Sequence, residues 1–267
     1  MKNLFDLTDR VVVITGATGV LGAPIVRHFV AQGARVVLLA RDEKKASLIC
    51  RGIEAETLFI PTDVLSREDL LSAYQATISR WSRVDVLINC AGGNMSGATL
   101  APEATIFDLD LSALHKVVDL NLFGTILPTM IFARSMAERG EGSIINFASL
   151  SALRPLTRVA GYGVAKAAVV NFTKYMCGEL ASKFGDKVRI NAIAPGFFLT
   201  DQNRDLLTLP DGSLSSRARQ IIAHTPFARF GKADELLGTL QYLASDASSF
   251  VSGTVAVVDG GFDAFSI

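Results

Sequence analysis

Seven short runs rich in Val, Ile and Leu recur along the chain, separated by longer amphipathic segments. They cover Arg10–Thr15, Ala34–Ala40, Ala55–Ile60, Val84–Asn89, Ser143–Ala148, Val188–Ile193 and Thr254–Val258. Their apolar residues do not alternate with polar ones, which is typical of parallel strands buried on both faces. Helical patterns cover Val20–Gln32, Ser66–Trp81 and Gly161–Phe184. The sequence therefore predicts one α/β domain over residues 1–267, a doubly wound parallel sheet in three α/β/α layers.

The composition argues against several classes of function. Of the 267 residues, 49% are apolar, and 26 Lys and Arg balance 26 Asp and Glu. A neutral charge disfavours non-specific nucleic-acid binding and a polybasic membrane anchor. No uninterrupted apolar run approaches the roughly 20 residues that span a bilayer, and the first residues lack a signal-peptide pattern. We therefore expect a cytoplasmic protein without a membrane partner.

Cysteine and histidine are sparse and scattered. The chain has three of each, and no Cys-x-x-Cys pair is present. Disulfide frameworks and zinc sites need paired or clustered ligands at short spacings. We expect reduced, buried thiols and no metal site.

The first predicted strand leads into a glycine-rich turn that precedes a helix. Its sequence is Thr15-Gly16-Ala17-Thr18-Gly19-Val20-Leu21-Gly22. Glycines allow a tight turn and let the backbone approach a pyrophosphate, whose charge is stabilised at the helix N-terminus. The alternative is an ordinary strand–helix turn. The glycine-rich turn is the first strand–helix turn of the chain, and this position favours a dinucleotide-binding turn. The residues expected to contact the dinucleotide are Gly16, Thr18, Gly19, Val20, Leu21 and Gly22.

Two later strands end in residues suited to the same cofactor. Asp63 and Val64 follow the third predicted strand, where Asp63 could accept a hydrogen bond from an adenine amino group or simply cap its own loop. Asn89, Ala91 and Gly92 end the fourth, where small residues let a cofactor lie against the sheet. The carboxyl ends of parallel strands meet at one edge, so these residues should lie together.

The end of the second predicted strand bears on the choice of cofactor. A carboxylate there would bind a free ribose 2′-hydroxyl, but Ala40 supplies none, and Arg41 follows. A guanidinium suits a 2′-phosphate in charge and geometry. NADP(H) is therefore favoured over NAD(H). Asp42 leaves the alternative open, because it could neutralise Arg41 or bind the ribose itself.

Tyr162 and Lys166 lie four residues apart on a predicted helix and so share one face. A phenol ordinarily has a pKa near ~10, and an adjacent ammonium lowers it. Ser149 ends the fifth predicted strand and could hold a substrate carbonyl oxygen. Asn121, in a helical stretch, could anchor a water leading to Lys166 or could merely kink the helix. These residues predict a proton donor.

Together these motifs resemble the short-chain dehydrogenase/reductase family over essentially the whole chain. Asn191, Pro195-Gly196 with Thr200, and Asp259-Gly260-Gly261 match as well. The resemblance implies a Rossmann-like fold that transfers hydride between a nicotinamide dinucleotide and an alcohol or ketone. It implies a catalytic tetrad of Asn121, Ser149, Tyr162 and Lys166, with Lys166 also holding the nicotinamide ribose. Further expected features are cofactor contacts from Pro195, Gly196, Phe198 and Thr200, and a homotetramer or homodimer.

One position departs from the family pattern. The single-domain branch usually has glycine where this chain has Val20, and the spacing Thr-Gly-x-x-Gly-x-x-Gly is that of the longer, extended branch. The length and the C-terminal motif match the single-domain branch. Because Val20 lies in the glycine-rich turn, this departure affects which residues of the turn are expected to contact the phosphates.

Residues on the expected substrate side resemble the sugar-acid subgroup that contains D-mannonate oxidoreductases (fructuronate reductases). The matching blocks are Ala91–Asn94, Arg154–Thr157, Ala194–Arg204, Ala223–Pro226 and Arg229–Gly231. A sugar acid needs a cation for its carboxylate and polar groups for its hydroxyls. We expect Asn94, Arg154, Arg158 and Asn203 to bind substrate, from or beside the irregular stretches near 92–114 and 200–229. Each arginine could instead be a solvated surface charge.

Three other functions remain as alternatives. The same fold could act on gluconate and 5-ketogluconate, or on a 3-oxoacyl thioester. A non-catalytic dinucleotide-sensing protein would usually lack the tyrosine–lysine pair. The polar, arginine-bearing substrate side favours a sugar acid.

Overall fold

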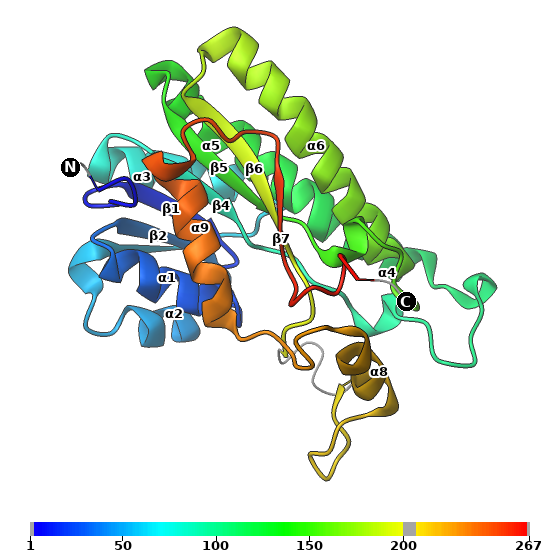
Figure 1. Ribbon diagram of the computed structural model, residues 1–267. Coiled ribbons are helices and arrows are strands. Elements are labelled where there is room, and N and C mark those ends of the chain that lie inside the picture. The colour runs from blue at the N-terminus through cyan, green and yellow to red at the C-terminus, as the bar shows by residue number, and fades with distance from the viewer. Residues whose placement is uncertain (1–2, 200–206, 266–267) are drawn as a thin grey trace.

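Seven parallel strands form one sheet in the computed structural model, which describes residues 3–199 and 207–265 (Figure 1). The strand order is β3-β2-β1-β4-β5-β6-β7. The strands are β1 (Val11–Thr15), β2 (Arg35–Ala40), β3 (Thr57–Pro61), β4 (Val86–Asn89), β5 (Gly142–Phe147), β6 (Val188–Pro195) and β7 (Val255–Val258). The order reverses between β1 and β4, so the predicted doubly wound, Rossmann-like sheet is confirmed.

Helices cover both faces of the sheet. They are α1 (Gly22–Ala31), α2 (Glu43–Cys50), α3 (Arg67–Trp81), α4 (Leu111–Val118), α5 (Gly124–Arg139), α6 (Ala160–Phe184), α8 (Ser216–His224) and α9 (Leu237–Ala244). The core on one face includes side chains from α1 and α9, and the core on the other includes side chains from α3, α5 and α6. The molecule is therefore the three-layer α/β/α structure that the sequence predicts.

Successive side chains of β1 enter opposite cores. Val12 and Ile14 join the layer with α1, whereas Val11 and Val13 join the layer with α3. All four are at most 1% exposed. Burying one such side chain contributes about 1.5–3 kcal/mol, which explains why these strands are apolar at every position.

The predicted helices are confirmed to within two residues, and local signals explain their starts. Ser66 precedes α3, and its Oγ accepts a hydrogen bond from Asp69 N at 3.1 Å, a side-chain N-cap. The sequence predicts no bounds for α2, α4, α5, α8 and α9, and α8 lies within the stretch near 200–229 that was expected to be irregular.

The segment Leu111–Arg139 is helical throughout and is long and apolar enough to cross a membrane by length and mean hydropathy. It is not an uninterrupted apolar run, because His115, Lys116 and Asp119 lie within it. In the fold this segment packs on the sheet, and its residues Phe132 and Met136 are fully buried in the core. It is a core helix of the domain.

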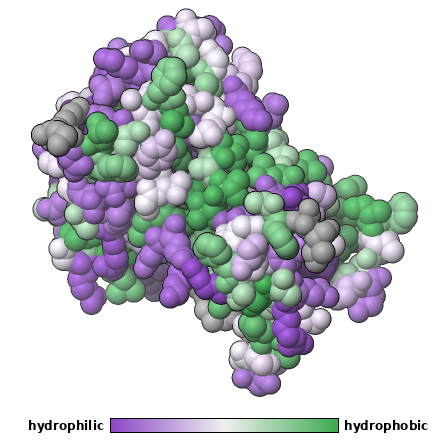
Figure 2. Space-filling view, viewed as in Figure 1, coloured by the Kyte–Doolittle hydropathy of each residue, from purple (hydrophilic) through white to green (hydrophobic). Residues whose placement is uncertain are grey.

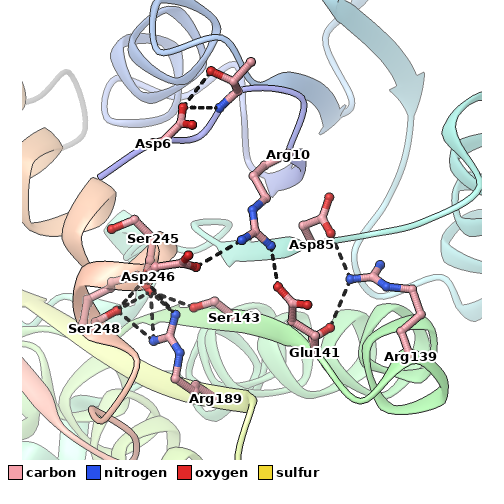
Figure 3. A network of polar contacts seen from close by, with 12 residues as sticks. Asp6, Arg10, Asp85, Arg139, Glu141, Ser143, Arg189, Ser245, Asp246 and Ser248 are labelled. Atoms are coloured by element: carbon pink, nitrogen blue, oxygen red, sulfur yellow. Dashed lines mark hydrogen bonds and ion pairs between the residues drawn. The ribbon is translucent and has the colours of Figure 1, made fainter. Parts of the chain in front are cut away.

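Ion pairs tie together the amino ends of the strands (Figure 3). Asp85, just before β4, is 3% exposed and pairs with Arg139 at 2.9 Å. Arg10, just before β1, pairs with Glu141 at 2.8 Å and with Asp246 at 3.1 Å. These charges neutralise one another at this edge. The opposite edge, at the carboxyl ends of the strands, carries the clefts described next.

Candidate active site

A cleft of about 890 Å³ opens at the carboxyl ends of β1 to β4. Its lining contains eleven of the predicted cofactor residues: Gly16, Thr18, Gly19, Val20, Leu21, Gly22, Arg41, Asp63, Val64, Ala91 and Gly92. Residues from four separate parts of the chain thus meet in one elongated space. Its size and backbone-rich lining fit a dinucleotide.

The glycine-rich turn packs too closely for side chains at two positions. Gly16 has φ +64°, and a Cβ there would lie 2.7 Å from Ala91 Cα. A Cβ on Gly22 would lie 2.4 Å from Gly16 O. The turn can therefore close over the end of β4 and start α1 only with glycine at both. Val20, where the sequence departs from the family pattern, needs no such freedom, and its side chain is 40% exposed in the cleft lining.

Asn89 lies beneath the cleft and does not line it. Its Nδ2 donates to Thr129 Oγ1 at 2.9 Å and to Asn146 Oδ1 at 2.8 Å. These bonds connect neighbouring strands to α5. A contribution of Asn89 to cofactor binding would therefore act through the position of the next two residues, Cys90 and Ala91, which do line the cleft.

The charged residues after β2 have different partners. The Asp42 carboxylate accepts a hydrogen bond from Lys45 N at 3.0 Å and so caps α2, and it lies 3.8 Å from Lys45 Nζ. Arg41 and Lys44 line the cleft.

Asp63, which follows β3, makes the loop-capping hydrogen bond that the sequence offered as one of its two roles. Its Oδ1 accepts a hydrogen bond from Leu65 N at 2.9 Å.

A second cavity, of about 170 Å³, contains three of the four predicted catalytic residues. Ser149, Tyr162 and Lys166 line it, as do Pro195, Gly196 and Phe198. It shares Leu21, Cys90 and Gly92 with the larger cleft, so the two spaces adjoin. Thr200 and Asn203 lie outside the described residues.

Burial sets the protonation of the tyrosine–lysine pair. Burial raises the pKa of Tyr162 above its ordinary value, while a hydrogen bond with Ser149 acts in the opposite direction. The phenol therefore keeps its proton at neutral pH. Burial also lowers the pKa of Lys166 to about 8. The Lys166 Nζ lies 5.7 Å from the centre of the Tyr162 ring.

Asn121 sits in a π-helical turn, Asp119–Phe123, between α4 and α5. Its Nδ2 donates to Val117 O at 2.8 Å and to Gly93 O at 2.7 Å, and its Oδ1 accepts from Gly93 N at 3.0 Å. The side chain thus fixes both the irregular turn and the strand end that carries Gly92. Such turns are frequent at functional sites. The sequence suggested an irregularity here but not its type.

The residues predicted to bind substrate differ in their hydrogen-bond and ion-pair partners. Asn94 Nδ2 donates to Thr99 Oγ1 at 2.6 Å, and its buried Oδ1 has no hydrogen-bond partner among the described residues. Arg154 Nε pairs with Asp263 Oδ1 at 2.6 Å. Arg158 Nε donates to Leu100 O at 2.5 Å.

Some lining residues were not assigned from the sequence. In the smaller cavity they are Cys90, Gly93, Phe147, Ala148 and Phe197. Each lies within two residues of an assigned residue in the chain, which is the signal that could have found them. Burial raises the pKa of the Cys90 thiol to about 12, so this group is neutral at the junction of the two spaces.

The family described as enoyl-(acyl carrier protein) reductase matches residues 16–263. An uncharacterised oxidoreductase of Bacillus subtilis, UxuB, is 39% identical over 98% of this chain and 97% of its own. The chain belongs to the short-chain dehydrogenase/reductase family. It is accordingly an NAD(P)-dependent oxidoreductase.

Two solved structures resemble this short-chain dehydrogenase/reductase along its whole length. A candidate D-mannonate oxidoreductase from Haemophilus influenzae with bound NAD has a TM-score of 0.89 and 36% identity, covering 99% of both chains. A gluconate 5-dehydrogenase from Burkholderia cenocepacia in complex with NADP and tartrate has a TM-score of 0.86 and 30% identity, covering 98% of both. Members of this family close to the present chain thus bind either dinucleotide.

Proposed function

We propose that this protein interconverts a secondary alcohol and a ketone on a sugar acid of the D-mannonate and D-fructuronate type. One observation carries the reaction: Ser149, Tyr162 and Lys166 line a single cavity that adjoins the dinucleotide cleft. The sugar-acid substrate is supported by the likeness to the Haemophilus influenzae structure and by the polar groups on the substrate side.

The proposed chemistry divides between cofactor and chain. The bound nicotinamide supplies or accepts the hydride. Ser149 and Tyr162 hold the carbonyl oxygen, and the Tyr162 phenol gives its proton to the alkoxide oxygen as it forms. The Lys166 ammonium stabilises the phenolate left behind and holds the nicotinamide ribose. Asn121 positions the strand end at Gly92 and a water that returns a proton toward Lys166.

We further propose a preference for NADP(H). Arg41 and Lys44 line the cleft beyond β2, and the Asp42 carboxylate is engaged as the N-cap of α2. Lys45 also lines this part of the cleft, as do the acidic residues Asp42 and Glu43. A 2′-phosphate would therefore find three cations, and the carboxylate next to Arg41 already has hydrogen-bond and charge partners.

Substrate contacts are proposed for Asn94, Arg154, Arg158 and Asn203. The unpartnered Asn94 Oδ1 is buried, so it would accept a hydrogen bond from a substrate hydroxyl once the loop around it shifts. Arg154 already binds Asp263 through Nε and Nη2, so a substrate carboxylate would have to use its Nη1 group or displace Asp263. A second substrate of the same class, gluconate, is favoured by the likeness to the gluconate 5-dehydrogenase.

A homo-oligomer and a cytoplasmic location complete the proposal. Figure 2 shows apolar side chains gathered over β7, the last strand of the sheet. Val257 on this strand is 40% exposed, and Phe250 just before it is fully exposed. Association of copies would cover such a surface. The cysteines at 50, 90 and 177 are free thiols, as suits a reducing compartment, although they are half-buried where the sequence predicted burial.

The test is consumption of NADPH, and separately of NADH, with D-fructuronate, 5-ketogluconate and simple ketones. Turnover of the keto sugar acids with faster use of NADPH is expected. Reaction with simple ketones or a 3-oxoacyl thioester alone would refute the sugar-acid assignment. Cofactor binding without turnover of any ketone would favour a sensing protein.

A further inference from the structure

Two arginines from distant parts of the chain meet beside the loop that leads to Tyr162. Arg217, in the first turn of α8, donates from Nη1 to Thr157 Oγ1 at 2.8 Å and from Nη2 to Thr157 O at 3.2 Å. Arg158 follows Thr157 directly in the chain. The two guanidinium groups are close enough for the charge of Arg158 to help lower the pKa of Arg217, after the larger effect of burial.

Hydrogen bonds to Leu100, in the irregular stretch near 92–114, hold Arg158 in place. Its backbone has φ +75°, a conformation that side-chain-bearing residues rarely adopt. Leu100 N donates to Arg158 O at 3.0 Å, and Arg158 Nε donates to Leu100 O at 2.5 Å. These paired bonds hold the strained residue and use only one of the guanidinium nitrogens. Both Nη groups of Arg158 lack a protein partner in the described ranges.

Neither guanidinium forms an ion pair within residues 3–199 and 207–265. Other arginines of the same region do: Arg154 pairs with Asp263 at 2.6 Å, and Arg229 pairs with Glu235 at 2.6 Å. Two like charges held together, and partly removed from water, destabilise each other. An anion bound between them would remove that repulsion.

Three elements that carry the candidate substrate residues converge at this pair. Thr157 and Arg158 belong to the loop between Ser149 and Tyr162. Leu100 belongs to the irregular stretch that carries Asn94. Arg217 belongs to the helix that follows the stretch after β6. An anion at the pair would therefore be held by the loop that joins Ser149 to Tyr162 and by helix α8, beside the stretch that carries Asn94.

We propose that Arg158 and Arg217 together bind the carboxylate of the substrate and that Arg217 is a specificity-determining residue. This inference rests on the proposed sugar-acid function and assigns its carboxylate site. Arg154 differs from this pair, because its ion pair with Asp263 holds the turn around Asp263 against the segment between Ser149 and Tyr162. A planar guanidinium fork matches a carboxylate in geometry, which a neutral sugar alcohol cannot exploit.

The experiment measures binding without turnover. Protein loaded with NADPH is titrated with D-mannonate and D-gluconate, and separately with D-mannitol and D-glucitol, and cofactor fluorescence is followed. An alcohol cannot react with the reduced cofactor, so the titration reports affinity alone. The variants are Arg158→Ala, Arg217→Ala and Arg217→Gln, which keeps a donor for Thr157. Arg219→Ala, on the same helix and exposed, is the matched control for the loss of one charge.

We expect the wild type to bind each acid more tightly than its alcohol. The variants at 158 and 217 should weaken acid binding on the order of 10- to 100-fold, as for loss of a charge-assisted hydrogen bond. Alcohol binding should not change, and Arg219→Ala should behave as wild type. Thermal unfolding of each variant shows that it is folded.

Two results would overturn the carboxylate site: acid affinity that survives in the variants at 158 and 217, or acids and alcohols weakened alike. Its failure is separable from failure of the proposed function. Turnover of keto sugar acids with no effect at either arginine would refute only the site. Selective binding of acids through both arginines, without turnover of any keto acid, would refute only the function.

Discussion

The Lys166 side chain donates a hydrogen bond from Nζ to the main-chain oxygen of Phe147 at 2.7 Å. Phe147 is the last residue of β5, and Lys166 is only 3% exposed. A strand end thus holds the cation in place beside the tyrosine before any ligand arrives. The same burial makes its charge sensitive to pH.

Reduction by the wild-type enzyme should decline as the pH rises through about 8. Burial lowers the pKa of Lys166 from 10.5 to about 8, so the ammonium is present below that pH and is lost above it. The measurement is kcat/KM for the reduced cofactor from pH 6 to 10, which reports the free enzyme. Lys166→Arg keeps its charge throughout and should lack this decline. A wild-type profile that stays level to pH 10 would contradict the assignment.

Tyr162→Phe should lower turnover by about 10²–10⁴-fold, the usual contribution of a general acid. The ring and its packing against Ala98, Ala113 and Val117 remain, so dinucleotide binding should stay nearly unchanged. Single-turnover rates and a cofactor titration measure the two effects separately. Turnover equal to wild type would remove Tyr162 from the mechanism.

Gly92→Ala should impair both stability and activity. An added Cβ would lie 2.7 Å from Asn121 Oδ1 and 3.1 Å from Lys166 Nζ, so both polar groups must move. We expect a loss of more than about 1 kcal/mol of unfolding free energy and at least a tenfold loss of kcat. Chemical denaturation and steady-state kinetics provide the readouts.

Gly178→Ala is the control for that variant, because nothing lies within 4 Å of the added Cβ on α6. It should gain about 0.5–1 kcal/mol from helix propensity and keep its activity. Normal activity in Gly92→Ala would mean that Asn121 and Lys166 need not hold these positions.

Arg41→Ala should raise KM for NADPH on the order of tenfold while leaving KM for NADH unchanged. Arg41 lines the cleft proposed for the cofactor, whereas Arg51, at the other end of α2, does not. Arg51→Ala therefore controls for the loss of one exposed charge. If both cofactors are affected equally by Arg41→Ala, the phosphate role of Arg41 is wrong.

The sheet could be predicted from sequence because its strands are buried on both faces. Val11 to Ile14 must all be apolar when they serve two cores, and few structures besides a buried parallel sheet need continuous apolar runs between helical patterns. The proximity of Tyr162 and Lys166 could also be predicted from sequence, because a four-residue spacing places both side chains on one face of a helix.

Contacts between distant parts of the chain could not be predicted in this way. Arg154 and Asp263 are separated by 109 residues, and nothing in either neighbourhood specifies the pairing. The same holds for Arg217 and Thr157, which are 60 residues apart. The π-helical turn at Asn121 also depends on tertiary bonds to Gly93, which a local pattern does not contain.

Leu21, Cys90 and Gly92 line both the larger cleft, proposed for the cofactor, and the smaller cavity, proposed for catalysis. A dinucleotide bound in the cleft would therefore form one wall of the space in which the ketone reacts. Substrate that arrives first meets an incomplete enclosure, so binding should be ordered, with dinucleotide entering first and leaving last. At saturating substrate, the departure of the spent dinucleotide would then limit the rate.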